Sequence, residues 1–331
     1  MTCITGIDVS KKFLDCAFRR DPGPAKAKRR RFMNNSGSYD SLLAWTETLA
    51  GRGCQDIIFV VEPTNIYHEL VVAFLFEAGA KVYLVNPARV RKFAEGIGIL
   101  SKNDVIDADL LTHYGLMSKK LIPYTPLPRD IATLKSLLGR LDTLERGLRR
   151  EQNRQEKVGK TSVFHKLEEQ SIQRFVKHHE VETKRFKKFI RETVEQSDLL
   201  QRDYELLTTM PGVGEKTAWT MLVILKSRPF NSAQEVASFI GLNPIEKRSG
   251  TTEYRRPRLS KAGNSYFRQS LFYPAMVATS KNPDIKVQYE RLLGNGKSKM
   301  CAIGAAMRKL VHICYGVVKN QEAYTVQSAI E

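Results

Sequence analysis

The sequence is poor in cysteine and contains no cysteine motif. None of its five cysteines stands in a CxxC pair, and no group of cysteine and histidine has the spacing of zinc ligands. An odd, scattered set excludes a disulfide framework and is typical of buried thiols in a reducing compartment. The five are Cys3, Cys16, Cys54, Cys301 and Cys314.

Long hydrophobic runs are also missing. The longest apolar stretch, near residues 70–76, is much shorter than the roughly 20 residues that cross a bilayer. The N-terminus lacks the succession of basic, apolar and small residues that marks a signal peptide. We therefore expect a cytoplasmic protein without a membrane partner.

The sequence also has fewer acidic than basic residues. Lys and Arg total 53 against 35 Asp and Glu, which gives a net charge of +18 and a pI near 9.7. A surplus of this size attracts polyanions, above all DNA and RNA, although a merely basic protein would have the same balance. The hydrophobic share of 42% is enough for packed cores, and 331 residues are enough for more than one domain.

The first 121 residues alternate strand and helix patterns. Three antiparallel strands followed by alternating helices and strands are the element order of a ribonuclease-H-like α/β domain. The strands are expected at residues 3–9, 13–19, 28–33, 56–62 and 81–85, and the helices at residues 38–49, 67–78 and 103–118.

The remainder is predicted to be mainly helical. The proline-rich stretch 122–129 cannot continue a helix and is expected to be a linker. Residues 130–205 lack proline and are predicted to form two long helices, a coiled arm that completes a middle domain from residue 122. Residues 206–331 are expected to form a third domain, with a basic loop at 247–258 and a closing helix at 300–319.

The predicted arm is basic. Residues 149–191 hold 13 Lys and Arg against 6 Asp and Glu, which suits a nucleic-acid backbone. The alternative is a solvated helical spacer, because charge runs on helices are often only solvated faces. Phe175, Phe186 and Phe189 are expected to be core residues of the arm and not platforms for base stacking.

Four acidic residues are predicted to form a metal site. Asp8 and Glu62 each stand at the end of an expected strand, and Asp104 and Asp107 are three apart, on one helical face. Carboxylates that converge repel one another without a cation, and sites made of oxygen select Mg²⁺ or Mn²⁺. Such a site assists phosphoryl transfer. Each acid by itself is weak evidence, because Asp is also favoured at turns and near helix N-termini.

Residues 206–220, LLTTMPGVGEKTAWT, match a helix-hairpin-helix pattern. Gly212 and Gly214 allow a tight turn whose backbone N–H groups can bind a phosphate, and Lys216 adds charge. The alternative is an ordinary turn between helices. The motif would hold DNA backbone without reading its sequence.

A serine-containing basic segment follows. Between Lys247 and Arg268 there are seven Lys and Arg and one acid, Glu253. A serine in such a field can attack a phosphodiester bond. The residues alone do not choose between Ser249 and Ser260, and a loop that only contacts phosphates remains an alternative. The residues expected to contact DNA here are Lys247, Arg248, Arg255, Arg256, Arg258 and Lys261.

Seven segments together resemble one known family. GIDVSKK, VVEPTNIY, NPARVRKFA, KNDVIDAD, MPGVGEKTA, RSGTTEYRRPRLSKAGN and GAAMRKL occur in the order seen in the IS-one-ten family of insertion-sequence transposases. These are also called DEDD transposases or bridge-RNA-guided recombinases. The resemblance spans nearly the whole chain, and the arm matches only in character. The sequence has Asn65 where the family often has Gly and Asn103 where it often has Thr.

The resemblance implies a RuvC-like N-terminal domain in which Asp8, Glu62, Asp104 and Asp107 bind Mg²⁺. It also implies a C-terminal transposase domain with Ser249 as nucleophile, forming a 5′-phosphoserine with one DNA strand. A non-coding guide RNA would pair with donor and target DNA, and the protein would form dimers and tetramers with composite active sites in a bacterial or archaeal cell. The rival readings are a RuvC-like nuclease or junction resolvase that uses water, and a DNA-binding scaffold without catalysis.

Overall fold

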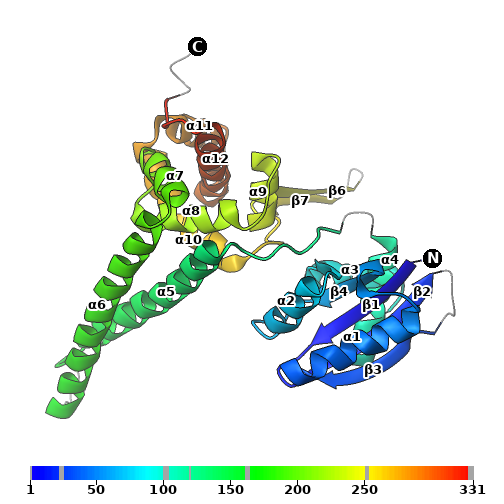
Figure 1. Cartoon of the computed structure of the whole chain (residues 1–331). Helices are drawn as coiled ribbons and strands as arrows, with labels where there is room; N and C mark the ends of the chain where they lie inside the picture. The colour runs from blue at the N-terminus through cyan, green and yellow to red at the C-terminus, as the bar shows by residue number, and fades with distance from the viewer. Residues whose placement is uncertain are drawn as a thin grey trace. The chain divides into compact units, whose positions relative to one another are not determined.

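The computed structural model describes residues 2–21, 26–99, 104–118, 121–160, 165–249 and 253–326. Within these ranges, the side chains of residues 104–106, 246–249 and 253–257 are not described. The chain divides into two compact units, Met1–Pro126 and Leu127–Glu331, and each is described by itself (Figure 1).

The first unit is built on a five-stranded mixed sheet of strand order β3-β2-β1-β4-β5. β1 pairs antiparallel with β2 and parallel with β4, so the first three strands form a meander and the last two are added by crossovers. The strands are β1 (Thr2–Val9), β2 (Phe13–Asp21), β3 (Lys28–Met33), β4 (Ile57–Glu62) and β5 (Lys81–Leu84). Its helices are α1 (Ser36–Ala50), η1 (Cys54–Asp56), α2 (Glu69–Glu77), α3 (Pro87–Gly96) and α4 (Asp104–Met117).

Helices cover both faces of this sheet. Alternate residues of β1 and β4 point to opposite sides, which gives each face its own apolar core. One core includes Ile7 and Phe59 with residues of α1 and α2, and the other includes Ile4 and Val60 with residues of α3 and α4. The α/β character and the element order predicted for this region are confirmed, and α3 is a helix that the sequence analysis did not predict.

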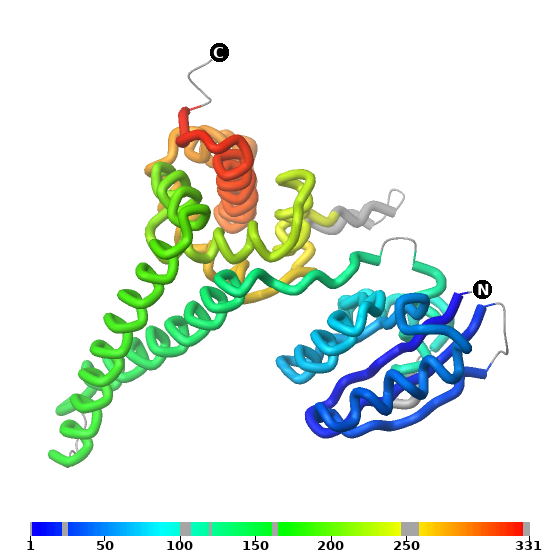
Figure 2. The backbone as a smooth tube through the Cα atoms, viewed as in Figure 1, coloured from blue at the N-terminus to red at the C-terminus, as the bar shows by residue number. Residues whose placement is uncertain are grey.

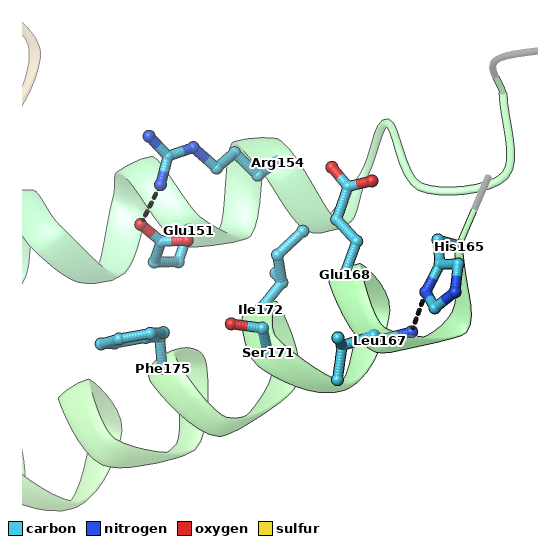
Figure 3. A pocket seen from close by; sticks show the side chains of 8 residues that line it. All are labelled: Glu151, Arg154, His165, Leu167, Glu168, Ser171, Ile172 and Phe175. Carbon is cyan, nitrogen blue, oxygen red and sulfur yellow. Dashed lines mark hydrogen bonds and ion pairs between the residues drawn. The ribbon is translucent and has the colours of Figure 1, made fainter. Parts of the chain in front are cut away.

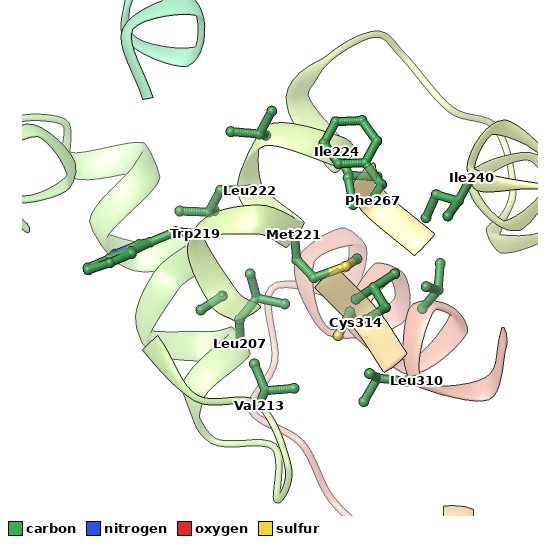
Figure 4. Packing of buried hydrophobic residues seen from close by; sticks show 14 of the residues in the cluster. Leu207, Val213, Trp219, Met221, Leu222, Ile224, Ile240, Phe267, Leu310 and Cys314 are labelled. Carbon is green, nitrogen blue, oxygen red and sulfur yellow. The ribbon is translucent and has the colours of Figure 1, made fainter. Parts of the chain in front are cut away.

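Within its described residues, the second unit is helical apart from one two-stranded sheet. Its large core surrounds α8 and contains side chains from most of the helices. Trp219, Met221 and Leu222 of α8 belong to this core (Figure 4). The helices are α5 (Arg129–Gln155), α6 (Lys166–Glu195), α7 (Asp198–Thr208), α8 (Glu215–Lys226), α9 (Ala233–Ile240), α10 (Ser265–Lys281), α11 (Pro283–Gly294) and α12 (Lys299–Asn320).

The long helices α5 and α6 pack side by side, as the tube in Figure 2 shows. At Gly147 of α5, an added Cβ would stand 2.6 Å from the ring of His179 of α6. The expectation that all three arm phenylalanines are core residues is wrong for two of them. The side chains of Phe175 and Phe189 are 54% and 53% exposed, whereas Phe186 packs against the core.

Two further features differ from the sequence-based expectation. The segment predicted as a basic loop forms paired strands, β6 (Pro244–Ser249) and β7 (Glu253–Leu259). Part of the predicted linker lies along the first sheet, because the backbone N–H of Tyr124 donates to the carbonyl of Val82 at 2.8 Å. Among the described helices, α12 alone is long and apolar enough to cross a membrane, but half of that stretch is buried, as in a core helix.

Candidate active site

Asp8 and Glu62 lie directly opposite each other on neighbouring parallel strands, β1 and β4. Both are partly exposed at the carboxyl ends of their strands. Asp8 and Glu62 lie on the same sheet face as Ile4 and Val60. The alternate residues of the two strands, such as Ile7 and Phe59, pack on the opposite face. Adjacent strands are about 4.8 Å apart, so the two carboxylates start from neighbouring backbone positions.

Helix α4 crosses this face in close contact with β1. A Cβ built on Gly6 would stand 2.3 Å from the carbonyl oxygen of Ala108, and one built on Gly115 would stand 2.8 Å from Val60 Cγ2 and 3.3 Å from Ile4 Cγ2. The N-terminal half of α4 therefore lies over Gly6 and its C-terminal half over Ile4. The helix runs antiparallel to β1, with its N-terminus toward Asp8.

This direction brings the remaining predicted acids to the same end of the sheet. Asp104 precedes Ala108 by four residues, about 6 Å along a helix. Asp8 follows Gly6 by two residues, about 6.6 Å along a strand. Asp104 and Asp107 thus occupy the helix turn level with Asp8, and Asp107 is half-buried there.

The geometry therefore pairs Asp8 with Glu62 and places the first turn of α4 beside them. The side chain of Asp104 is outside the described residues. Among the side chains that are described, no three Asp, Glu, His or Cys residues lie close enough together to hold a metal ion. The four-acid metal site remains a prediction, and its donors are all oxygen atoms, which suits Mg²⁺ or Mn²⁺.

A fifth carboxylate, Asp15, stands opposite Asp8 on the other side, in β2. The sequence analysis missed it, although a lone acid in the apolar run FLDCAF was a usable signal. Its two oxygens accept from Nε and Nη2 of Arg31, at 2.8 and 3.1 Å. Burial, followed by the negative charges of Asp15 and Asp8, raises the pKa of the Cys16 thiol well above its ordinary value.

Asp109, the extra acid of the KNDVIDAD segment, is held by two arginines. Its carboxylate pairs with Arg19 at 2.8 Å and with Arg29 at 3.0 Å. Burial acts to raise the pKa of Asp109, but hydrogen bonds and charge from these arginines outweigh it, and the pKa is lowered. Arg19 is itself buried and also donates to Thr112, so this group ties α4 to β2.

Asn34 braces the chain segments that follow the two paired acids. Its amide nitrogen donates at 2.9 Å both to the carbonyl of Ser10, after β1, and to that of Tyr67, after β4. The hydroxyl of Tyr39 holds the amide oxygen at 2.8 Å. Asn65 adopts a φ of 48°, in the left-handed region that favours glycine and that Asn also tolerates. Asn103 is outside the described residues.

The predicted helix-hairpin-helix segment joins α7 to α8. Gly212 has a φ of 96°, and a Cβ there would meet Ala278 of α10 at 2.8 Å, so packing alone already requires glycine. Gly214 is the residue before α8, and its Cβ position is open. Lys216 pairs with Asp142 and Glu145 of α5. The phosphate-binding role of this segment remains a prediction.

Ser249 is the last residue of β6, where it pairs with Glu253 of β7. The backbone register also places Lys247 opposite Arg255. The side chains of Lys247, Arg248, Ser249, Arg255 and Arg256 are outside the described residues.

The basic segment continues beyond β7, where the side chains are described again. Arg258 and Lys261 are exposed. Ser260 is half-buried, and its backbone N–H donates to Asn243 at 2.8 Å. Gly263 packs so tightly against the end of α9 that a Cβ would stand 2.0 Å from the carbonyl of Phe239, which fixes the loop after β7.

A cavity of about 680 Å³ lies between the end of α5 and the start of α6. Figure 3 shows Ile172 and Phe175 lining it beside the ion pair of Arg154 with Glu151. None of the predicted site residues lines this cavity.

Both units match transposase families. A family model described as a transposase, of the DEDD type in the IS110 group, matches residues 5–159. A second model, described as the transposase IS116/IS110/IS902 family, matches residues 204–290. The class of the protein is therefore that of the transposases.

Full-length relatives agree with the family models. The pilin gene-inverting proteins of Moraxella lacunata and Moraxella bovis are each 27% identical to this chain over 321 residues, 96% of either sequence. An uncharacterised 43.6 kDa protein of insertion element IS110 from Streptomyces coelicolor is 28% identical over 120 residues, 36% of this chain and 29% of that protein. The chain belongs to the IS110 family of transposases.

The chain is also similar to a solved structure. RuvC of T. thermophilus in complex with a Holliday junction substrate is 16% identical, with a TM-score of 0.28, and the match covers 38% of this chain and all of that one.

Proposed function

We propose that this protein is a DNA recombinase that exchanges strands through Ser249, assisted by a divalent cation that Asp8, Glu62, Asp104 and Asp107 hold. The observation that carries the proposal is the pairing of Asp8 with Glu62 at the strand ends where the first turn of α4 arrives. Membership in the IS110 family supports DNA as the substrate, and so does the pilin gene-inverting function named for the Moraxella relatives.

The acid set fits Mg²⁺, with Mn²⁺ as a substitute, because every donor is a carboxylate oxygen. When bound, the cation supplies positive charge where the phosphoryl group becomes more negative. The task of the chain is to hold the carboxylates together. Gly6 permits the close approach of α4, and Asn34 braces the two segments beyond the strands.

Ser249 is the proposed nucleophile. Its Oγ attacks the phosphorus of one DNA phosphodiester bond and the bond to the 3′ oxygen breaks, which leaves a 5′-phosphoserine and a free 3′-hydroxyl group. The serine proton passes to solvent, and the departing 3′ oxygen takes up a proton from solvent. Basic residues around β6 and β7 favour the charge that develops, and the family resemblance favours Ser249 over Ser260.

The partners follow from the family resemblance and from charge. We expect donor and target DNA, a non-coding guide RNA that selects the sites, and dimers or tetramers in which the acids and the serine come from different protomers. The basic α5–α6 pair is assigned to RNA backbone and the turn at Gly212 and Gly214 to DNA backbone. In this proposal the domains are residues 1–121, 122–205 and 206–331.

Two variants test the function against its rivals. Ser249→Ala should abolish strand exchange and any covalent protein–DNA adduct. Asp107→Asn should abolish DNA cleavage while DNA binding persists, because a half-buried carboxylate becomes a neutral amide of the same size. Thr325→Ala, at an exposed position of the C-terminal tail, is the control and should act like the wild type.

The alternatives give different results in the same assay. If Ser249→Ala still cleaves DNA with Mg²⁺, the protein is a nuclease that uses water. If the wild type binds DNA and neither variant alters any measured property, the protein is a binding scaffold.

A further inference from the structure

The edge strand β3 carries four consecutive basic residues, Lys28 to Arg31, whose side chains alternate between the two sheet faces. Phe32 belongs to the core beneath α1 and α2, so Lys28 and Arg30 lie on that side. Arg29 and Arg31 lie on the opposite side, the face of Asp8 and α4.

The register of the sheet puts Arg31 in one row with the acids. Arg31 pairs with Asp15, Asp15 with Asp8, and Asp8 with Glu62. Since Arg31 is two strands away from Asp8, their backbones are about 10 Å apart. An arginine can reach most of that distance, so its guanidinium stands beside the proposed reaction centre.

Each of the two arginines on this face rests on a more buried carboxylate. Arg31 is 50% exposed over Asp15, which is 13% exposed. Arg29 is 48% exposed over Asp109, which is 20% exposed. A carboxylate holds each guanidinium while about half of each arginine side chain stays exposed to solvent.

We propose that Arg29 and Arg31 bind two neighbouring backbone phosphates of the DNA strand that lies across the acid set, an inference that rests on the function proposed above. The two residues are about 6.6 Å apart along the strand, comparable with the spacing of successive phosphates in one DNA strand. Arginine suits the role, because its planar donors match phosphate oxygens. The contact would place the reactive phosphodiester bond beside Asp8.

The β3 strand offers a matched control. The double variant R29A/R31A removes two positive charges from the acid face, and K28A/R30A removes two from the opposite face of the same strand. Binding of the full-length protein to a fluorescein-labelled DNA duplex is measured by anisotropy over a series of NaCl concentrations at fixed Mg²⁺. The log of the binding constant falls linearly with the log of the salt concentration, and the slope is the steepness of this fall. Each lost phosphate contact lowers the slope by about 0.9.

We expect R29A/R31A to lower the slope by about 1.8 and K28A/R30A to leave it unchanged. Asp15→Asn should keep the wild-type slope, because Arg31 stays available. Equal slopes for both double variants would overturn the proposal. An Asp15→Asn slope as low as that of R29A/R31A would also overturn it, since the ion pair of Arg31 with Asp15 would then act only on structure. A change seen with an RNA duplex and not with DNA would also overturn it.

A second measurement does not depend on variant folding. Wild-type protein is modified with an arginine-specific dicarbonyl reagent, with and without the duplex, and the peptides are read by mass spectrometry. Arg29 and Arg31 should be protected by DNA while Arg30 is not, and equal protection of all three would contradict the inference. If Asp107→Asn abolishes cleavage but the two double variants bind alike, this inference fails and the proposed function stands. If Asp107→Asn still cleaves DNA and R29A/R31A has a lower slope than K28A/R30A, the proposed function is refuted and this inference stands.

Discussion

The close contact between Gly6 and α4 sets the position of the helix beside Asp8 and Glu62. In Gly6→Ala, the new methyl carbon would stand 2.3 Å from the carbonyl oxygen of Ala108 and 2.8 Å from Leu111 Cβ. Both atoms belong to a packed helix, so no flexible side chain can yield. To restore ordinary contact near 3.5 Å, α4 must move by about 1 Å.

That displacement has two expected effects. Overpacking of this kind costs about 1–3 kcal/mol in the free energy of unfolding. Moving the first turn of α4 away from Asp8 and Glu62 by about 1 Å should weaken Mn²⁺ binding and lower strand cleavage by on the order of 100-fold.

The assay combines urea unfolding with Mn²⁺ titration of the folded protein. Gly96→Ala is the control, because its Cβ position in the same unit is open and it should be neutral or slightly stabilising. Wild-type stability together with wild-type Mn²⁺ affinity in Gly6→Ala would refute the packing of α4 on β1 described above.

Three further predictions concern single side chains. Asn34→Ala removes three side-chain hydrogen bonds, so the free energy of unfolding should fall by about 3 kcal/mol and Mn²⁺ affinity should drop; unchanged affinity would rule out a bracing role. Lys226→Met leaves the fully buried Asp203 without its cation at 2.6 Å, and the expected loss of about 3 kcal/mol in urea unfolding should be largely recovered by adding Asp203→Asn. The lowered pKa of Asp109 means that its ionised form stabilises the fold above the unfolded pKa near 3.8. Wild type should therefore be more stable than Asp109→Asn at neutral pH, and this advantage should vanish as the pH falls through the folded pKa; an advantage that does not vary with pH would contradict the assignment.

Much of the first unit could be predicted from the sequence, because its strands and helices carry strong local patterns. β3 is found where the sequence analysis expected it, and the other predicted elements of the first unit differ by a few residues at their ends. α3 was missed although Asn86 and Pro87 form a recognisable helix start, in which the Asn86 side chain accepts from the N–H of Ala88 and of Arg89. β6 and β7 could not be recognised, because their charged residues show no apolar alternation and only pairing makes them strands.

The candidate site, too, could be predicted from the sequence only in part. Asp8 and Glu62 could be placed together from the sequence, because parallel strands end at one edge. The antiparallel direction of α4 and the row that joins Arg31 to the acids depend on sheet register, which no local pattern specifies. The expectation for Phe175 and Phe189 was wrong because residue spacing alone does not tell how much of a helical side chain its neighbours cover.

Covalent trapping of the serine tests the central claim most directly. Wild-type protein is incubated with its DNA and Mg²⁺, quenched, digested and analysed by mass spectrometry for nucleotides attached to the peptide that contains Ser249. The account predicts a phosphodiester adduct on Ser249 that is absent with EDTA and in Asp8→Asn. DNA cleavage that proceeds without any adduct on that peptide would contradict serine-mediated strand exchange.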